Sequence, residues 1–355
     1  MVKVGIVGMG FGAAVHIPAC LLTDGVELVA LADGGSGKAI RRASELSFPV
    51  QVFNNGEAAV CWSGLDIVCI ASPATTQFEL VRRALYANKH VICEKPFTTS
   101  SAQATELMKL AIQRDLNIGV CYEFRYNSHI SKLSSLAGSG EFGDINRLAV
   151  TWHANSGLSP SRKWSWKNDG SQAGGVLTDW CSHAIDYGSL ILESRIERVA
   201  CRLGSRVSHL DNDFGKRKLV TAPDFCELHC QFENGVWATF SVSNTQPNGM
   251  GHRIELFGDA GWARYHLRPP YTLNDKSLIW CGKSGSGDYR FCDVGNADDR
   301  VQAMSGFMRD YTALVNLGQA SKKLPTCKDA IYVWQVIEAA ERSFAEGQGF
   351  QRVMQ

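Results

Sequence analysis

The first third of the chain alternates short apolar runs with longer segments of mixed polarity. The apolar runs predict strands at residues 3–7, 27–32, 66–71, 90–93 and 117–121. The segments between them predict four helices. The first ends near residue 22, and the others cover residues 38–46, 75–87 and 101–114. Strands joined by helices of this length make right-handed crossovers, so residues 1–122 are expected to form a doubly wound, parallel Rossmann sheet in an α/β fold.

Beyond residue 122 the pattern changes to strict alternation of apolar and polar positions. This alternation predicts half-exposed strands at residues 146–154, 198–206, 225–232, 237–242, 253–257 and 263–267. Glu233-Asn234-Gly235 is typical of a hairpin turn between two of them. Helices are expected at residues 176–192, 303–317 and 328–346, and the Gly- and Ser-rich residues 276–296 are expected to form a mobile surface loop.

These elements predict a second, α+β domain over residues 123–355, built on a large, open and mostly antiparallel sheet. The prediction allows the last helix of this domain to pack back on the first domain.

The charge balance excludes several classes of partner. With 36 basic and 35 acidic residues, nothing in the composition favours nucleic acid or an anionic membrane surface. No apolar run reaches the roughly 18 residues of a membrane span, and the first residues lack the pattern of a signal peptide. The 12 cysteines are scattered and lie mostly within apolar runs, so we expect reduced thiols and a cytoplasmic protein.

A glycine-rich turn follows the first predicted strand. Gly8 permits the tight turn, Gly10 lets backbone amides approach a pyrophosphate, and Ala13, beside Gly12, stands at the third small position of the fingerprint. Asp33 ends the second strand, where an acidic residue accepts hydrogen bonds from the adenosine ribose. The sequence therefore predicts a dinucleotide site.

The choice between NAD and NADP stays open at this point. Asp33 would repel a 2′-phosphate and favours NAD, but Ser36, Lys38, Arg41 and Arg42 follow closely and could hold that phosphate. The alternative for these basic residues is a solvated helix face, which leaves NAD as the favoured cofactor.

Candidate chemistry lies at Glu94-Lys95-Pro96, directly after the strand at residues 90–93. A partly buried lysine at this edge of the sheet loses its proton more readily than one in water and can act as an acid or base. Asp179 and His183 are four residues apart on a predicted helix, which places them on one face. Together the three residues could remove a hydroxyl proton while a hydride leaves the same carbon.

These motifs resemble the Gfo/Idh/MocA oxidoreductase family, the group of glucose–fructose oxidoreductase and inositol dehydrogenase. The resemblance runs through residues 5–12, 16–19, 89–96, 140–143, 174–183, 232–235 and 324–325. It implies a Rossmann domain followed by an open-sheet domain that commonly builds dimers or tetramers. It also implies catalytic and binding roles for Lys95, a frequently cis proline at Pro96, and a site completed by Asp179 and His183.

Two positions depart from the family pattern. Gln77 stands in the loop after Ser72-Pro73 where many members have histidine, and Cys181 replaces a frequent glycine between Asp179 and His183.

The expected sites are then as follows. Catalysis is assigned to Lys95, Asp179 and His183. Cofactor contacts are expected from Gly8, Gly10, Phe11, Gly12, Ala13, Asp33, Lys38, Ser72, Pro73, Gln77, Glu94 and Lys95. Substrate contacts are expected from Lys95, Tyr122, Arg125, Trp152, Trp166, Asp179 and His183. Aromatic faces with nearby donors suit a sugar ring or cyclic polyol, whereas Arg125 and Lys167 could also hold a carboxylate or phosphate. No ligand set at metal spacing is expected.

Three functions remain open from the sequence. The first is an NAD(P)-dependent dehydrogenase or reductase of a sugar, sugar derivative or cyclic polyol, assembled as a homodimer or homotetramer through the second sheet. The second is a glycosidase of the same fold that uses NAD transiently for oxidation and elimination. The third is a non-catalytic regulator that binds a dinucleotide, which the presence of Lys95, Asp179 and His183 disfavours.

Overall fold

The structure is a computed structural model that describes residues 1–268, 276–296 and 299–354. Contacts divide the chain into two units: Met1–Tyr126 with Arg300–Ile331, and Asn127–Asp299 with Tyr332–Gln355. The sequence-based division at residue 122 differs from this one mainly in residues 300–331, which belong to the first unit. Their apolar side chains, among them Met304, Phe307 and Tyr311, are buried in its core.

The first unit contains a six-stranded sheet in the order β3-β2-β1-β4-β5-β6, and all of its pairs are parallel. Its strands are β1 (Val2–Val7), β2 (Val26–Ala32), β3 (Gln51–Phe53), β4 (Ile67–Ile70), β5 (His90–Cys93) and β6 (Ile118–Val120). The order reverses between β1 and β4, which is where open α/β sheets bind ligands at the carboxyl ends of their strands. The predicted doubly wound sheet is confirmed, and only the short β3 was missed.

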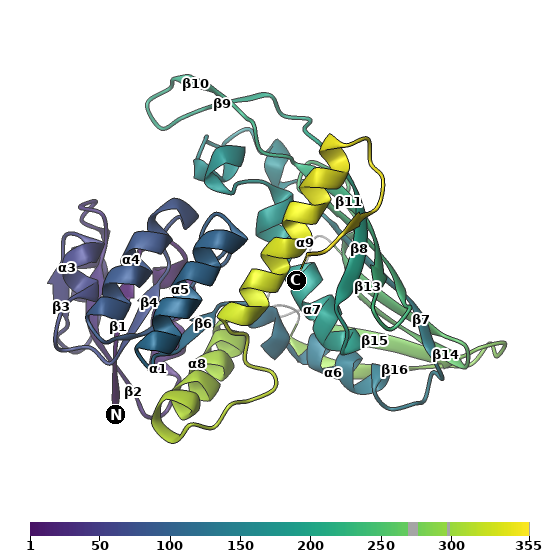
Figure 1. Ribbon diagram of the computed structural model, residues 1–355, viewed down its shortest axis with the longest axis horizontal. Coiled ribbons are helices and arrows are strands. Elements are labelled where there is room, and N and C mark those ends of the chain that lie inside the picture. Colours follow the sequence, from purple (N-terminus) through teal and green to yellow (C-terminus); the bar gives the residue numbers. More distant parts are fainter. Residues whose placement is uncertain (269–275, 297–298, 355) are drawn as a thin grey trace. The chain divides into compact units, whose positions relative to one another are not determined.

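Helices cover both faces of this sheet (Figure 1). One face carries α1 (Ile17–Leu21), α2 (Lys38–Ser44) and α8 (Arg300–Leu317), whose apolar residues join Val4 and Ile6 of β1 in one core. The other carries α3 (Gly56–Val60), α4 (Ala74–Tyr86) and α5 (Ser101–Gln113). On that face Gly56 lies so close to Val7 and Leu80 that a Cβ would fall 2.8 Å from the valine.

The second unit is built on a nine-stranded sheet in the order β16-β15-β14-β13-β7-β12-β11-β8-β17. Its strands are β7 (Ile145–His153), β8 (Ile196–Gly204), β11 (Phe225–Phe232), β12 (Trp237–Ser243), β13 (Gly251–Gly258), β14 (Gly261–Leu267), β15 (Lys276–Lys283), β16 (Tyr289–Asn296) and β17 (Gln351–Arg352). Only β7 and β12 pair in parallel; the remaining neighbours are antiparallel. The predicted large, mostly antiparallel sheet is confirmed.

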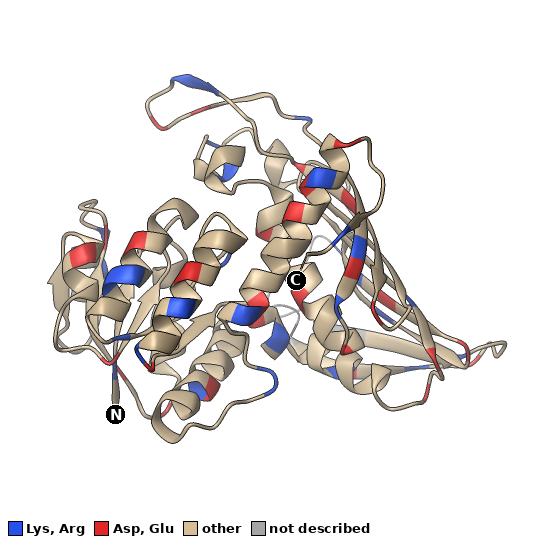
Figure 2. Ribbon diagram, in the orientation of Figure 1, with Lys and Arg blue, Asp and Glu red and all other residues tan. Residues whose placement is uncertain are grey.

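One face of this sheet is covered by helices and the other is polar. The covering helices are α6 (Ser128–Ala137), α7 (Ser182–Leu192) and the second-unit part of α9 (Cys327–Ala345). Gly188 of α7 lies against Leu148 and Phe240, which point inward. The side chains between these inward positions point to the opposite face of the sheet. Figure 2 shows acidic and basic residues near one another along the strands of this sheet.

The prediction of a mobile surface loop at residues 276–296 is wrong. These residues form the antiparallel hairpin β15–β16, which extends the sheet beyond β14. Ile279 and Cys281 are buried while Trp280 between them is half-buried, which is the alternation of a strand. Most of the glycine and serine is concentrated in the turn at residues 284–287, and averaging over the whole segment concealed the strands.

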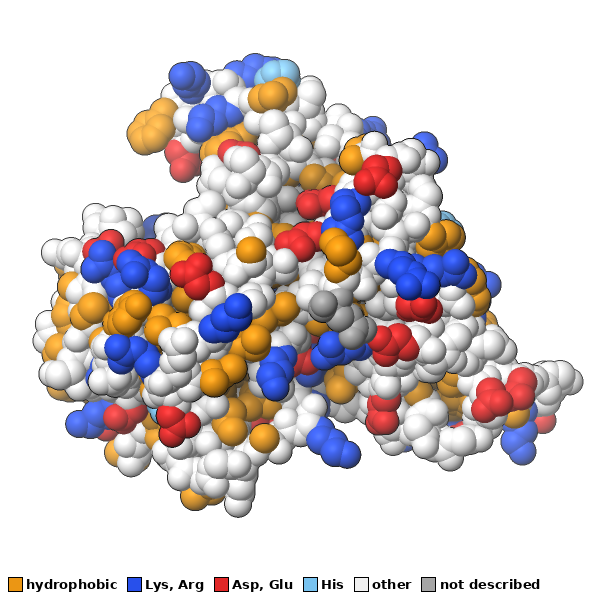
Figure 3. Space-filling model, in the orientation of Figure 1, with side chains coloured by type: hydrophobic (Ala, Val, Ile, Leu, Met, Phe, Trp, Pro, Cys, Tyr) orange, Lys and Arg blue, Asp and Glu red, His pale blue; other side chains and the backbone are white. Residues whose placement is uncertain are grey.

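A second short hairpin, β9 (His209–Asp211) with β10 (Arg217–Leu219), also escaped prediction. On the face drawn in Figure 3, several lysine and arginine side chains lie over this hairpin, together with acidic and apolar ones. Across the described ranges, no helix is at once long and apolar enough to span a bilayer.

Candidate active site

The glycine turn after β1 is fixed by close packing at two of its glycines. Gly8 has φ +105°, and a Cβ there would lie 2.3 Å from the carbonyl oxygen of Ala71. A Cβ at Gly12 would lie 3.0 Å from Ile6, because the helical segment Gly12–His16 packs directly on β1. That segment is a π-helical turn, a form that occurs frequently at functional sites.

Gly10 has the opposite surroundings. It is exposed, and a Cβ there would meet nothing within 4 Å. The open space above Gly10, next to a helix N-terminus, is where a pyrophosphate approaches the backbone in Rossmann sites. The residues of the turn therefore fit the phosphates of a dinucleotide.

Asp33 lies buried at the carboxyl end of β2 and organises the loop that follows. Its carboxylate accepts hydrogen bonds from Gly35 N (2.8 Å), the Ser36 hydroxyl (2.8 Å) and Ala39 N (3.0 Å). Burial acts to raise the pKa of Asp33, but these hydrogen bonds outweigh it and the pKa is lowered. The carboxylate is thus held ionised at the position expected for the ribose contact.

The basic residues after Asp33 are partly engaged by the chain itself. Arg42 forms an ion pair with Glu45 and also contacts the carbonyl oxygen of Ala13 at 3.4 Å. Ser36 donates to Asp33 and so is turned toward the carboxylate. Lys38 and Arg41 remain exposed. This arrangement favours NAD, because two of the groups proposed for a 2′-phosphate already have other partners.

Gln77 joins two loops at the same edge of the sheet. Its Nε2 donates to the carbonyl oxygen of Ser72 (3.2 Å), and its Oε1 accepts from Thr98 N (2.8 Å). With a side chain buried in this way, Gln77 links the loop after β4 to the loop after β5. A direct contact of Gln77 with the cofactor stays a prediction, as do those of Phe11, Ala13 and Pro73.

Glu94 and Lys95 follow β5, and the Lys95-Pro96 peptide is cis, as the resemblance implied. Glu94 is buried and its Oε1 lies 2.7 Å from Nε2 of His16, whose ring is fully buried. Lys95 is half-buried. The Glu94–His16 contact anchors the residue before Lys95 to the π-helical turn after β1.

His16, Glu94 and Cys121 also place three potential metal ligands within 4.8 Å of one another. Burial strongly raises the pKa of the Cys121 thiol, and the negative charge of Glu94 adds to this effect. A protonated thiol is a poor metal ligand, and His16 and Glu94 are already bound to each other. The group therefore fits a buried polar contact better than a metal site.

Tyr122 and Arg125, predicted to contact substrate, are buried in the first unit. Nη2 of Arg125 lies 2.8 Å from Oδ1 of Asp329, near the start of α9. This ion pair gives Arg125 a structural role, and its contact with substrate stays a prediction.

In the second unit, Asp179 lies on a π-helical turn (Leu177–Cys181) and His183 near the start of α7. The helix predicted over residues 176–192 is therefore present, with a wider first turn. Oδ2 of Asp179 accepts from Nζ of Lys167 at 2.9 Å. The sequence analysis did not pair Asp179 with Lys167.

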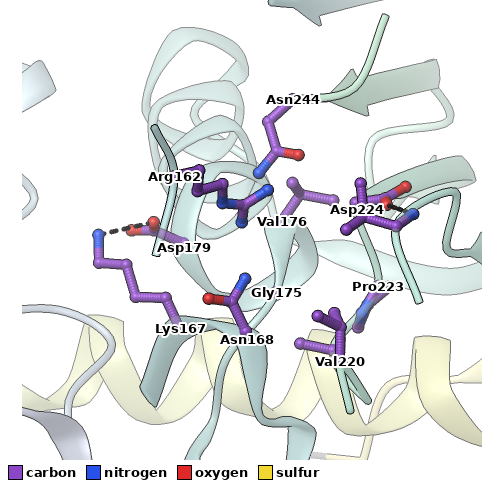
Figure 4. Close-up of a pocket in the computed structure, with 12 residues that line it drawn as sticks. Arg162, Lys167, Asn168, Gly175, Val176, Asp179, Val220, Pro223, Asp224 and Asn244 are labelled. Carbon is purple, nitrogen blue, oxygen red and sulfur yellow. Dashed lines mark hydrogen bonds and ion pairs between the residues drawn. The ribbon is translucent and has the colours of Figure 1, made fainter. Parts of the chain in front are cut away.

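Lys167 and Asp179 line a small cavity of about 40 Å³ (Figure 4). Arg162, Asn168, Asp224 and Asn244 contribute its other polar side chains, none of which was singled out from the sequence. They are spread over loops and strand ends, so no spacing in the sequence indicated that they meet.

The charges of this cavity are balanced. Asp224 is buried and accepts from the backbone amides of Arg206 and Val207 and from the Thr245 hydroxyl. Oδ1 of Asn244 is buried with no hydrogen-bond partner among the described residues. Donors and acceptors thus both face the cavity.

Of the tryptophans predicted to bind substrate, Trp152 lies within an aromatic stack. Its ring centroid lies 5.0 Å from that of Trp180 and 4.6 Å from that of His252. The ring of His183 is 6.4 Å away, which brings two predicted substrate residues together. Trp166 is half-buried, with Nζ of Lys167 5.8 Å from its ring centroid.

Comparison with known proteins decides the family. Residues 2–122 match the model of an oxidoreductase family with an NAD-binding Rossmann fold, and residues 130–264 match the GFO/IDH/MocA C-terminal domain. An uncharacterized oxidoreductase of Synechocystis sp. is 30% identical over 263 residues, which cover 73% of this chain and 70% of the relative. The chain belongs to the GFO/IDH/MocA oxidoreductase family.

Further similarities agree with this membership. Glucose-6-phosphate 3-dehydrogenase of Bacillus subtilis is 28% identical, over 77% of this chain and 76% of its own. A levoglucosan dehydrogenase, solved with NADH and levoglucosan, matches with a TM-score of 0.87 at 18% identity, over 100% of this chain and 99% of the other. At that identity the likeness shows the fold alone.

As a GFO/IDH/MocA oxidoreductase, the protein has an NAD-binding Rossmann domain, and the predicted cofactor class is confirmed. The roles of individual residues stay predictions. Glu123, which the sequence analysis did not single out, belongs with them because it is buried close to Glu94 and Lys95.

Proposed function

We propose that the protein transfers a hydride between NAD and a secondary alcohol or ketone of a sugar, sugar derivative or cyclic polyol. The observation that carries this proposal is the set of groups at the carboxyl edge of the first sheet. The open glycine turn follows β1, ionised Asp33 ends β2, and half-buried Lys95 follows β5. Ligands of doubly wound sheets bind at this edge, which supports a cofactor site and an acid/base group there.

Lys95 is assigned the proton transfer. When bound, the nicotinamide supplies the hydride acceptor or donor. In oxidation, the neutral amine of Lys95 takes the hydroxyl proton as the C–H bond breaks; in reduction, its ammonium returns that proton to the oxygen.

Asp179 and His183 are assigned to substrate hydroxyls. Asp179 is held by Lys167 at one carboxylate oxygen, Oδ2. His183 is buried on α7 beside Trp152, and its ring can exchange hydrogen bonds with a substrate hydroxyl.

The cavity next to Asp179 favours a neutral substrate group. Two cations, Arg162 and Lys167, face two carboxylates, Asp179 and Asp224, so a phosphate would meet repulsion as well as attraction. A hydroxyl both donates and accepts, and so can serve Asn244 Oδ1 and Arg162 at once. This supports an unphosphorylated polyol over a sugar phosphate, in contrast to the named substrate of the Bacillus relative.

A panel assay tests the proposal. Neutral sugars, inositols, sugar acids and their phosphates are incubated with NAD or NADP, and formation of the reduced cofactor is followed by its absorbance. We expect net reduction of NAD with at least one neutral sugar or inositol. Hydrolysis of a glycoside without net NADH would indicate the glycosidase, and NADH binding without either reaction would indicate a regulator.

A variant pair tests the substrate assignment. Asp179→Asn should raise KM and lower kcat together, because the carboxylate both orients and polarises the substrate. Lys163→Met, which removes an exposed lysine outside the cavity, serves as the matched control and should leave both constants unchanged. Full activity of Asp179→Asn would remove Asp179 from the site.

A further inference from the structure

A buried polar cluster lies close to Lys95 in the first unit. It consists of His16 from the π-helical turn, Glu94 after β5 and Glu123 at the start of the 3-10 turn Glu123–Tyr126, with exposed fractions of 0%, 7% and 3%. The segments after β5 and β6 run side by side, since the backbone amide of Cys121 donates to Cys93 at 2.9 Å. The two carboxyl groups therefore belong to adjacent segments of one sheet edge.

Glu123 differs from Glu94 in its hydrogen bonding. Oε1 of Glu94 is held by His16, whereas Oε2 of Glu123 is buried and has no hydrogen-bond partner among the described residues. Burying an ionised carboxylate with one oxygen lacking any donor is costly, while the neutral carboxyl group is tolerated. This geometry favours a protonated Glu123.

The surrounding charges agree with that protonation state. Burial raises the pKa of Glu123 most, and the negative charge of Glu94 raises it further; Lys95, a hydrogen bond from the backbone amide of Glu123 and Arg300 act in the opposite direction. The balance brings the pKa of Glu123 to about 8. Two carboxyl groups side by side favour one shared negative charge, as in other carboxyl pairs.

We propose that Glu123 stores a proton at neutral pH and exchanges it with Lys95, so that it acts as the proton reserve of the acid/base lysine. This inference rests on the proposed function, because it needs Lys95 to gain and lose a proton in each turnover.

The proton balance is simple in both directions. In reduction, an N–H bond of the Lys95 ammonium breaks and the substrate O–H bond forms. The O–H bond of Glu123 then breaks, an N–H bond forms on Lys95, and the Glu123 carboxylate regains a proton from solvent. In oxidation the same transfers run backwards, and the ionised carboxylate of Glu123 accepts the proton that Lys95 took from the alcohol.

Infrared titration tests proton storage without any substrate. The carbonyl stretch of a protonated carboxyl group is compared between the unmodified protein and Glu123→Gln across pH. We expect a band at neutral pH that is absent from Glu123→Gln and fades with a midpoint near pH 8. The control Glu106→Gln, an exposed residue of α5, should keep the band. No difference between the unmodified protein and Glu123→Gln would overturn the proposal.

Kinetics test the exchange with Lys95. D-glucose, glucose 6-phosphate and myo-inositol are the probes, and the one oxidised fastest by the unmodified protein is used. Glu123→Gln should lower kcat at least tenfold, leave NADH affinity unchanged, and remove the limb of the pH–rate profile near pH 8. An unchanged profile would overturn the exchange. Absence of turnover with these probes and with the whole panel above would refute the proposed function, while the infrared titration would still decide proton storage.

Discussion

Single side chains at the ends of strands carry most of the assigned chemistry, and Asp33 is the clearest case. Its carboxylate holds the following loop through Gly35, Ser36 and Ala39. The backbone amide of Lys38 also hydrogen-bonds this carboxylate, so a ribose hydroxyl would share an oxygen with one of these donors. Asp33 shapes the loop, and we propose that it also selects the cofactor.

Asp33→Ser should weaken NADH binding about 10- to 150-fold, since a charge-assisted hydrogen bond contributes about 1.5–3 kcal/mol. NADPH binding should weaken less or improve, because the negative charge opposing the 2′-phosphate is gone. Fluorescence titration of both cofactors gives the two dissociation constants. Tighter binding of NADPH than NADH by the unmodified protein would show that Lys38 and Arg41 decide instead.

Acid stability of the second unit depends on buried histidines. The His129 ring stacks on Tyr265 with centroids 4.1 Å apart, and neither ring nitrogen has a hydrogen-bond partner among the described residues. Burial, and secondarily His252, lowers the pKa of His129; burial lowers that of His252 to about 3. Both rings are neutral when folded and gain protons on unfolding below about pH 6.5. The stability that depends on these neutral rings is therefore fully present above that pH and is lost as the pH falls below it.

His129→Phe should flatten this pH dependence. Each such histidine costs about 1.4 kcal/mol of stability per pH unit below about 6.5, so the variant should recover about 2 kcal/mol at about pH 5 relative to the unmodified protein. Calorimetric unfolding at neutral pH and at about pH 5 measures it. The exposed His209→Phe is the control and should not change the slope. An equal loss of stability in His129→Phe and the unmodified protein would contradict the account.

At the scale of elements, two glycines of the turn after β1 are expected to have different roles, Gly8 in stability and Gly10 in cofactor binding. Gly8→Ala forces a Cβ to within 2.3 Å of Ala71 O at a φ of +105°, so it should lower stability by about 1–3 kcal/mol. Gly10→Ala meets no protein atom within 4 Å and should keep the melting temperature, yet it should weaken NADH binding at least tenfold by filling the phosphate approach. Thermal unfolding and cofactor titration of both variants check the pair. Normal NADH affinity in Gly10→Ala would place the phosphates elsewhere.

Elements with a strong period were predictable from the sequence, and those defined by tertiary contacts were not. The buried strands of the first sheet and β11, predicted over residues 225–232 and found at Phe225–Phe232, follow from local patterning. The hairpin β15–β16 was missed because its glycines and serines masked an alternation that only pairing with β14 makes plain. The π-helical turns carrying His16 and Asp179 have no sequence signal of their own.

The site divides in the same way. Lys95 and the glycine turn stand in short motifs, so they could be identified directly. Glu123, Arg162 and Asn244 could not, because their significance lies in burial, missing hydrogen-bond partners and neighbours distant along the chain.

At the scale of the whole molecule, the uncovered face of the sheet in the second unit is a candidate surface for assembly. Its uncovered face carries exposed Glu227 and His229 on β11, with Thr239 of β12 paired to His229. We predict a homodimer or homotetramer through this face. Thr239→Arg, near the middle of the sheet, should yield monomers in light scattering, whereas Glu106→Arg on the exposed side of α5 should not. An unchanged mass for Thr239→Arg would exclude this face.

The central claim, hydride transfer to NAD with Lys95 as acid/base, is tested most directly by single-turnover formation of NADH. Unmodified protein, Lys95→Ala and Lys95→Arg are mixed with NAD and the best substrate of the panel. We expect both variants to bind NADH normally but to form NADH about 10²–10⁴-fold more slowly, because alanine has no base and arginine stays protonated. Near-normal rates in Lys95→Ala, or loss of NADH binding as its main defect, would contradict the account.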